Sequence, residues 1–260
     1  MQTLEHLPEQ LLESPTPTKR TLVCIPAFNE EENIPKVLEN LLSFQTSDFH
    51  YDILVINDGS TDETARVCSE HGVSVISHIY NVGYGAALKT AYKFAVSHEY
   101  DFIIQMDADG QHDVSNIQRI YEAFSETEDT DIIIGSRFMQ ESVSFHIPIH
   151  KKFAIGFFRK IIKLSTSNEI TDPTSGLQGL NRRAFAFYAK FDNFAMDYPD
   201  ANMIIQMALN NFTVKEIPAV MHVRLHGESM HSGFYRPIKY IIIMMLSTLI
   251  VIMRERIKRK

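Results

Sequence analysis

The sequence predicts an α/β fold, a mostly parallel β-sheet flanked by helices. Between residues 21 and 137, apolar runs of strand length alternate with segments of helical spacing, and this alternation is typical of βαβ units. Several runs end in clusters of Asp, Asn, Glu and Gly, and the carboxyl ends of parallel strands are where such sheets bind ligands. At 260 residues, 45% hydrophobic and 22% charged, the chain suffices for one domain, alone or with an appendage.

The elements of the first half follow from these runs. Strands are expected at 22–27, 53–56, 73–77, 102–106 and 132–134. The segments between them predict helices at 32–44, 62–71, 85–98 and 115–125. Ser60 or Thr61 is expected to cap the second helix, and Val114 with Ser115 opens the fourth.

The regular alternation stops after Arg137. Helices are then expected at 151–165, 182–190 and 201–210, and a strand at 213–223. We expect a loosely held arm at 1–20, one globular domain at 21–235 with its halves divided at 137, and an apolar, basic tail at 236–260.

The tail contains Tyr240 to Met253, fourteen residues without a charge, and five of the last seven residues are basic. A helix of that length spans about 21 Å, less than the roughly 30 Å of a bilayer's hydrocarbon core. The flanking bases favour a helix that lies in an anionic membrane surface. The alternative is a helix of the core or of an oligomer interface.

Composition excludes several classes of protein. A formal net charge of −7 argues against a nucleic-acid binder, which normally has a broad basic face. The two cysteines, Cys24 and Cys68, predict neither a disulfide framework nor a cysteine nucleophile, and they favour a reducing compartment. Because the first residues lack the pattern of a secretory signal, we expect the protein on the cytoplasmic side. The oligomeric state stays open, a homo-oligomer included.

Two carboxylates mark the end of the strand expected at 102–106. Asp107 and Asp109 are separated by one residue, and Gly110 follows them. Strands are depleted in Asp, and two oxygen ligands on a short loop suit Mg²⁺ or Mn²⁺ bound to a diphosphate. A polar turn is the alternative for such a pair in isolation.

Other polar clusters follow neighbouring strands. Glu30 or Glu31 after the first strand and Asp58 after the second are suited to accept hydrogen bonds from a base and a ribose, or else to form caps and turns. The Gly-rich loop at 81–87 contains Gly85 and is followed by Lys89, a charge near a bound nucleotide sugar. This loop lacks the spacing of a dinucleotide fingerprint.

In order along the chain, these motifs resemble those of the family 2 inverting glycosyltransferases, in the branch of dolichol- and polyprenyl-phosphate sugar synthases. The resemblance runs from about residue 21 to 232, and its motifs are IPAFNEEENI, VINDGSTDET, NVGYGAAL, QMDADGQHD, GSRF and DPTSGLQGLNR. It implies a GT-A fold, with 21–137 as the nucleotide-sugar half and 138–235 as the acceptor half.

The resemblance also implies roles for individual residues. Pro26, Phe28 and Glu30 or Glu31 would form the base and ribose pocket, with Asp58 reading the base. Asp107 and Asp109 would bind the metal, with Gln111 as a metal or sugar contact.

On the acceptor side, Arg137 and the run Asp172 to Gly176, which includes Ser175, would flank the donor sugar and the acceptor phosphate. Residues 224–229 are similar to a loop over the diphosphate, with contacts from Arg224 and Ser229. Met230 stands where the family has Lys, so Arg224 or His231 is expected to supply that contact. Zinc at His222, His226 and His231 is disfavoured because no cysteine or second acidic cluster accompanies them.

The identity of the acceptor decides which groups the reaction needs. A sugar hydroxyl requires a general base, for which Asp200 or Asp197 is the candidate. A lipid phosphate is already anionic, so cations such as Arg137, Arg182, Arg183 and Arg224 would position it. The chain has no Trp and therefore no QxxRW motif of processive synthases, which favours transfer of one sugar.

We therefore expect a metal-dependent transferase that moves one hexose from a UDP- or GDP-sugar to polyprenyl phosphate at the cytoplasmic membrane face. Transfer to a saccharide hydroxyl on a lipid carrier, in the assembly of cell-surface polysaccharide, is the alternative. A nucleotidyltransferase would carry a basic Gly-rich loop after the first strand, where this chain is acidic. An inactive assembly subunit is disfavoured because the acidic residues of the pocket are all present.

Overall fold

The computed structural model describes residues 19–47, 49–127, 129–145, 147–190, 194–195, 198–224, 226 and 235–258. Within these residues, strands β1 (Thr21–Ala27), β2 (Asp52–Asn57), β3 (Ser74–Ser77), β4 (Phe102–Gln105), β5 (Ile132–Ser136), β6 (Gln178–Asn181) and β7 (Val214–Pro218) form one sheet. Its order is β3-β2-β1-β4-β6-β5-β7. Neighbouring strands are parallel except β6, which is antiparallel to β4 and β5.

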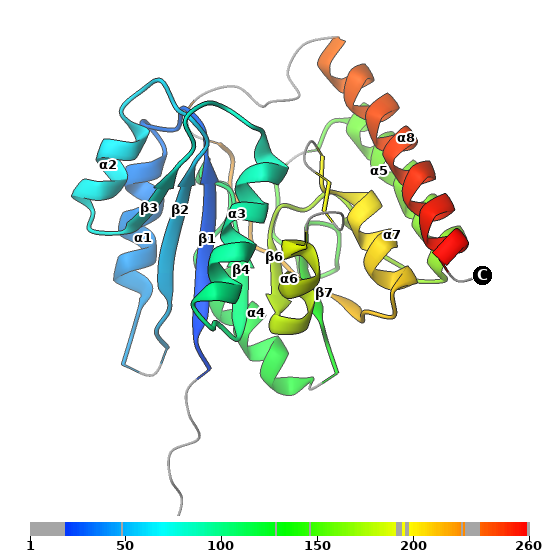
Figure 1. The fold of residues 1–260 in the computed structure, drawn as a ribbon, viewed down its shortest axis with the longest axis horizontal. Helices are drawn as coiled ribbons and strands as arrows, with labels where there is room; N and C mark the ends of the chain where they lie inside the picture. The colour runs from blue at the N-terminus through cyan, green and yellow to red at the C-terminus, as the bar shows by residue number, and fades with distance from the viewer. Residues whose placement is uncertain are drawn as a thin grey trace, which may run out of the picture.

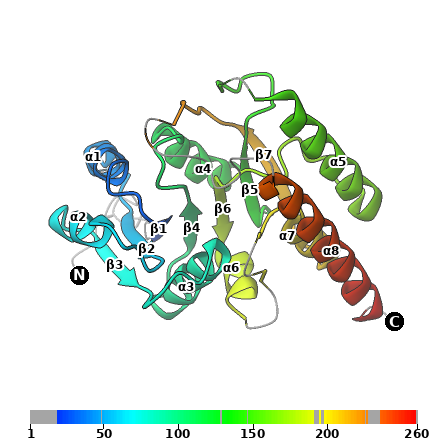
Figure 2. The same cartoon turned by 90° about the horizontal axis from the view of Figure 1, so that it is seen from above.

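Helices cover both faces of this sheet (Figures 1 and 2). The helices α1 (Ile34–Phe44), α2 (Thr64–Glu70) and α4 (Ser115–Glu126) contribute to one apolar cluster. The other cluster is formed with α3 (Tyr84–Ser97), α5 (Ile149–Thr166), α6 (Arg182–Ala189), α7 (Ala201–Leu209) and α8 (Tyr235–Lys258). The predicted layered α/β architecture is confirmed.

The periodicities of the sequence explain these layers. β1, β4 and β5 are buried along their whole lengths, as expected for strands with helices on both faces, and they read as nearly continuous apolar runs. The helix α1 buries Ile34, Val37, Leu38 and Leu41, the i, i+3, i+4, i+7 spacing of one helical face.

The strand β6 is absent from the sequence-based prediction. Its four residues, Gln-Gly-Leu-Asn, are half polar and carry no alternating apolar pattern. A Cβ at Gly179 would lie 2.2 Å from Ile120 Cγ2 and 2.9 Å from Phe124 Cε2. The glycine therefore lets α4 pack directly on the backbone of β6, and it also conceals the strand in the sequence.

Most boundaries differ from the prediction by one or two residues, and the start of the second helix and the end of the last strand differ in an informative way. The N-cap of α2 is Glu63, whose own side chain makes no capping bond; Asp62 Oδ1 accepts hydrogen bonds from the Thr64 backbone N–H and hydroxyl. Ser60 and Thr61 instead bond to Asn29 in the loop after β1. The strand β7 ends at Pro218, well before the predicted residue 223, and the chain beyond it keeps only isolated bridges.

The last helix, α8, extends beyond the fourteen uncharged residues to 24 residues. It packs on α7, and Met244 and Val251 belong to the core. In the part of the chain that the structure describes, no helix has both the length and the apolar character needed to span a membrane.

Candidate active site

The carboxyl ends of β1, β2 and β4 bring the predicted acidic clusters together. These strands are adjacent and parallel, so the segments after Ala27, Asn57 and Gln105 meet at one edge of the sheet. This is the edge at which open α/β sheets bind ligands. A candidate active site is therefore built from three loops distant in sequence.

Asp107 is held in place by two side chains, Tyr84 and His112. Tyr84 donates a hydrogen bond of 3.0 Å to Asp107 Oδ1, and His112 Nε2 lies 3.2 Å from Oδ2. Burial alone would raise the pKa of Asp107, but the hydrogen bonds and charge of His112 and Tyr84 hold this pKa below its usual range. Because the side chain is 35% exposed, an ionised carboxylate stays accessible from solvent.

Asp109 lies close enough to Asp107 for the two charges to interact. Burial, followed by the negative charge of Asp107, raises the pKa of Asp109. Its Oδ1 accepts a hydrogen bond from the backbone N–H of Gln111 at 3.0 Å. Two neighbouring carboxylates that repel each other form a donor set stabilised by a divalent cation.

The donor set fits Mg²⁺ or Mn²⁺. No group of three or more His, Cys, Asp or Glu side chains suited to a metal occurs among the described residues. Mg²⁺ is typically bound by one or two carboxylates together with substrate phosphates, so Asp107 and Asp109 suffice on the protein side. The Gln111 side chain donates to His222 O at 3.4 Å.

Arg224 connects the loop after β1 to the carboxylate pair. Its guanidinium bonds to Glu30 Oε1, and its Nε lies 4.0 Å from Asp109 Oδ2. Asn33 donates to Glu30 Oε2 at 2.7 Å and to the carbonyl of His226 at 3.2 Å. A cation from the second half of the chain therefore lies among acidic groups of the first half.

Asp58 holds the Gly-rich loop. Its Oδ1 accepts hydrogen bonds from His78 and from Val82 N–H, and its Oδ2 accepts one from Gly83 N–H at 2.7 Å. A carboxylate has about four acceptor positions, and these contacts fill three of them; the Asp58 side chain itself is buried. Gly59 approaches this loop closely, since a Cβ there would lie 2.4 Å from the Tyr80 carbonyl carbon.

The other residues predicted for the donor side differ in exposure. Phe28 is 44% exposed. Glu31 is also exposed, and its carboxylate accepts the Glu63 N–H at 2.9 Å. Pro26, Gly85 and Lys89 are buried, Pro26 in β1 and the other two in α3.

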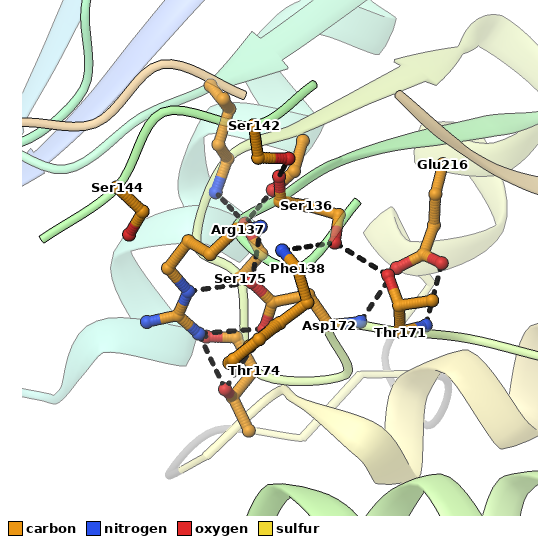
Figure 3. A network of polar contacts seen from close by, with 12 residues as sticks. Ser136, Arg137, Phe138, Ser142, Ser144, Thr171, Asp172, Thr174, Ser175 and Glu216 are labelled. Carbon is orange, nitrogen blue, oxygen red and sulfur yellow. Dashed lines mark hydrogen bonds and ion pairs between the residues drawn. The ribbon is translucent and has the colours of Figure 1, made fainter. Parts of the chain in front are cut away.

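Arg137 is the centre of a polar network that includes Asp172, Thr174 and Glu216 (Figure 3). It donates to both carboxylate oxygens of Asp172, at 2.6 and 2.7 Å, and to Thr174 Oγ1 at 2.8 Å. Glu216 of β7 accepts the backbone N–H groups of Thr171 and Asp172 at 2.7 Å each. Burial would lower the pKa of Arg137, but Asp172, followed by Asp107 and Asp200, raises it.

Ser175 and Gly176 complete this side of the site. The Ser175 hydroxyl is buried and donates to Gly135 O at 2.6 Å. A Cβ at Gly176 would lie 2.7 Å from Asp107 Oδ2, so only glycine fits beside that carboxylate.

Asp200 precedes α7 and joins the site from the second half of the chain. Tyr240 of α8 donates a 2.7 Å hydrogen bond to its Oδ2. Burial raises the pKa of Asp200 to about 6; the Tyr240 hydrogen bond and Arg137 lower it, and the charge of Asp107 adds to the rise. Asp197, Ser229, Met230 and His231 lie outside the described residues.

Arg182 and Arg183 do not belong to this site. Arg182 donates to Tyr100 O just before β4, and Arg183 pairs with Asp131 just before β5. Both contacts lie at the amino ends of those strands, on the opposite edge of the sheet from Asp107. The prediction that these two arginines position an acceptor is wrong, and they fasten α6 to the sheet.

Sequence reasoning missed four residues that shape the site: Tyr84, His112, Glu216 and Tyr240. Tyr84 and His112 occur inside quoted motifs, NVGYGAAL and QMDADGQHD, so their positions were a usable signal. Glu216 and Tyr240 reach the site only through tertiary contacts, and no local pattern points to them.

Comparison with known proteins assigns the chain to a family. The model of the family described as "Glycosyl transferase family 2" matches residues 22–188, more than half of the chain. The chain belongs to glycosyl transferase family 2. The matched region runs from β1 to α6 and includes Asp107, Asp109, Arg137 and Asp172. The protein is a family 2 glycosyltransferase, as predicted.

Named relatives match most of the chain. A polyprenol monophosphomannose synthase of Mycolicibacterium smegmatis is 29% identical over 236 residues, 84% of this chain and 83% of that protein. An undecaprenyl-phosphate mannosyltransferase of Micrococcus luteus is 27% identical over 225 residues, 82% and 88% of the two chains.

Among solved structures, a glucosyl-3-phosphoglycerate synthase of Mycobacterium tuberculosis was crystallised with Mn²⁺, UDP and glucosyl-3-phosphoglycerate. It superposes with a TM-score of 0.66 at 17% identity and covers 96% of this chain and 86% of its own. This likeness confirms the predicted GT-A fold.

Proposed function

We propose that this glycosyltransferase moves one hexose from a nucleotide sugar, of the UDP-glucose or GDP-mannose type, to a polyprenyl phosphate at the cytoplasmic face of the membrane. The carboxylate pair Asp107 and Asp109, held at the carboxyl edge of β4 in a family 2 chain, carries the proposal. The lipid acceptor is supported by the two relatives that are named for transfer to polyprenyl or undecaprenyl phosphate.

The donor diphosphate would bind beside the carboxylate pair. Asp107 and Asp109, with Gln111 nearby, would hold Mg²⁺ or Mn²⁺, which would neutralise the charge that develops on the leaving diphosphate. Arg224, 4.0 Å from Asp109, lies within reach of the same phosphates. On this proposal, Arg224 exchanges its contact with Glu30 for one with the donor.

The base and ribose would occupy the loops after β1 and β2. Phe28 is exposed and offers an apolar face for the base. Glu30 and Glu31 offer carboxylates for the ribose, and Asp58, which holds the Gly-rich loop, would read the base. The buried Pro26, Gly85 and Lys89 would support these loops, and Ser229 would contribute from the loop after Arg224.

The acceptor would approach from the side of Arg137. A phosphate oxygen attacks C1 of the sugar on the face opposite the diphosphate, and the bond from C1 to the diphosphate oxygen breaks. Arg137 is held rigidly by Asp172 and Thr174, so it can orient an anionic acceptor at little entropic cost. The buried Ser175 would fix this wall of the site.

One observation favours the alternative acceptor. The pKa of Asp200, raised by burial to about 6, suits a general base that takes a proton from a sugar hydroxyl near neutral pH. Transfer to a saccharide hydroxyl on a lipid carrier is therefore the second candidate function.

The test is a screen of UDP- and GDP-hexoses with undecaprenyl phosphate and a divalent cation, with the product identified by mass. Transfer of one hexose is expected with one donor. Asp109→Asn should lower the rate at least a hundredfold. Asp101→Asn, just before β4 at the opposite edge of the sheet, is the matched control and should stay within about threefold of wild type.

The result that counts against the proposal is equally specific. If Asp109→Asn retains full activity, the role of the carboxylate pair is wrong. If only a lipid-linked saccharide accepts the sugar, the alternative function replaces the first.

A further inference from the structure

The helix α5 turns an apolar stripe toward solvent. Ile149, Phe153, Phe157 and Leu164 follow one face of the helix and are 72%, 75%, 43% and 75% exposed. The opposite face is buried through Ile155, Phe158 and Ile162. Exposed aromatic and aliphatic side chains of this size in a row mark a surface that binds something apolar.

The helix α8 has the same division. Its buried stripe consists of Met244, Thr248, Val251 and Glu255. Its outward face has a long apolar stripe, with exposed Lys239 and Arg256 toward its two ends: Ile242, Met245, Leu246, Leu249, Ile250, Met253 and Ile257, all between 45% and 71% exposed. Both helices contact α7, and both views place them side by side at the end of the molecule away from α1 and α2 (Figures 1 and 2).

The same two helices concentrate positive charge. Together α5 and α8 contain ten Lys or Arg residues and one acid, Glu255, which is a net charge of +9. The whole chain carries −7, so the remaining residues carry −16. Glu255 is buried and bonded to Arg254 and Lys258, and no acidic residue of either helix is exposed.

We propose that α5 and α8 together form one docking face for an anionic membrane surface, on which both helices lie in the interfacial plane. Apolar stripes with bases beside them are the pattern of interfacial helices. An anionic leaflet complements the charge of this face. This proposal rests on the proposed function only for the lipid nature of the acceptor.

A second copy of the chain fits this face less well. In a two-fold dimer the same patch meets itself. That arrangement would bring the exposed basic side chains of one copy, such as Lys152 and Lys160, toward the same residues of the other, and like charges across an interface are unfavourable. The charge therefore selects lipid over self-association.

A groove on α5 strengthens the assignment. It is a shallow, open depression of about 420 Å³ on the outer surface of the helix, lined by Ile149, Phe153, Gly156 and Phe157, with Lys152 and Lys160 beside them. A Cβ added at Gly156 would have no neighbouring atom within 4 Å, so the row of side chains has a gap at its middle. An apolar floor flanked by two ammonium groups is suited to a lipid chain with an anionic headgroup.

The docking face is fastened to the acceptor side of the site. Tyr240 of α8 donates to Asp200, and Arg159 of α5 donates to the Thr171 carbonyl next to Asp172. A membrane bound by these helices would lie beside the residues proposed to receive the acceptor. Docking would then deliver a long-chain lipid to the site without lifting it far from the bilayer.

The experiment measures sedimentation of the full-length protein with vesicles of phosphatidylglycerol and phosphatidylcholine, or of phosphatidylcholine alone. Wild type should pellet with the anionic vesicles and much less with the neutral ones. Lys152→Gln with Lys160→Gln should weaken anionic binding about 25-fold at low salt, since each charge contributes about fivefold. Added salt should shrink this difference.

Substitutions confined to α5 test its share of the face. Phe153→Glu with Leu164→Glu should reduce vesicle binding at least tenfold, whereas Leu42→Glu, on an exposed position of α1, should leave it unchanged. Circular dichroism melts establish that each variant is folded. The α5 variant should keep transfer to a short, water-soluble prenyl phosphate and lose transfer to undecaprenyl phosphate in vesicles.

Three outcomes overturn the proposal: wild type that does not bind anionic vesicles, an α5 variant that binds as wild type does, or a lipid-free dimer in light scattering that the α5 variant dissociates. The last result would assign the face to a second copy. Failure of the proposed function is distinguishable, because wild type would then bind vesicles and transfer sugar to neither prenyl phosphate.

Discussion

Replacing Asp200 by Asn should stabilise the protein, and by an amount that depends on pH. The pKa of this carboxyl rises from its ordinary 3.8 to about 6 in the folded state, chiefly through burial. A raised carboxyl pKa means that the folded state holds the proton more tightly than the unfolded chain. The stabilisation from the protonated form is complete below about pH 4 and is lost as pH rises through about 6.

The magnitude follows from the difference between the two pKa values. About two pKa units correspond to about 3 kcal/mol once the carboxyl is fully ionised. By linkage, ionisation of Asp200 lowers the free energy of unfolding of wild type by about 1 kcal/mol at pH 4.5 and about 3 kcal/mol at pH 7.5. Asparagine does not ionise, and its amide oxygen still accepts the hydrogen bond from Tyr240, so the variant escapes this penalty.

The assay is urea unfolding of wild type and Asp200→Asn at pH 4.5 and 7.5, without divalent cation or donor. The variant should gain about 2 kcal/mol more at the higher pH. A gain that is equal at both values, or a variant less stable than wild type at pH 7.5, would refute this account of Asp200.

The same variant separates the two acceptors. If the nucleophile is a phosphate, no base is needed, and Asp200→Asn should keep its rate within about tenfold of wild type. If the nucleophile is a sugar hydroxyl, loss of the base should cost about 10² to 10⁴ in rate.

Three further changes test other parts of the structure. Tyr240→Phe removes a hydrogen-bond donor to Asp200 and should raise the pKa of that carboxyl further. In urea unfolding, the loss of stability with rising pH should therefore occur at higher pH than in wild type. A pH profile equal to that of wild type would contradict the contact. Asp172→Asn leaves Arg137 without its carboxylate and should cost about 3 to 5 kcal/mol of unfolding free energy, with an unchanged denaturation midpoint as the contrary result. Gly179→Ala should cost about 1 to 3 kcal/mol because its Cβ would lie 2.2 Å from Ile120 Cγ2, and a variant as stable as wild type would show that α4 can move aside.

Much of the donor half was predictable because its information is local. Buried parallel strands read as apolar runs, and the polar residues that follow them mark the ligand edge. Asp107 and Asp109 stand out for this reason, as does the alternation that gives β1 to β5. Because β2, β1 and β4 are adjacent and parallel, the three loops that follow them lie together at one edge of the sheet.

The acceptor half was less predictable because its contacts are not local. The strand β6 is too short and polar to show periodicity, and its pairing partners lie on separate segments. Arg182 is the last residue of a quoted motif and Arg183 comes directly after it, yet β6 runs antiparallel and places both at the far edge of the sheet. The direction of a strand is a property of the fold that charge and spacing do not encode.

The reversal of β6 also has a mechanical consequence. The loop before an antiparallel strand, and not the loop after it, reaches the ligand edge, so residues 172–177 lie beside Asp107 as the chain enters β6. The ladder from Gln105↔Gln178 to Phe102↔Asn181 then joins the donor and acceptor halves as one body. The two halves therefore share one continuous sheet, and separating them would break the backbone hydrogen bonds of that ladder.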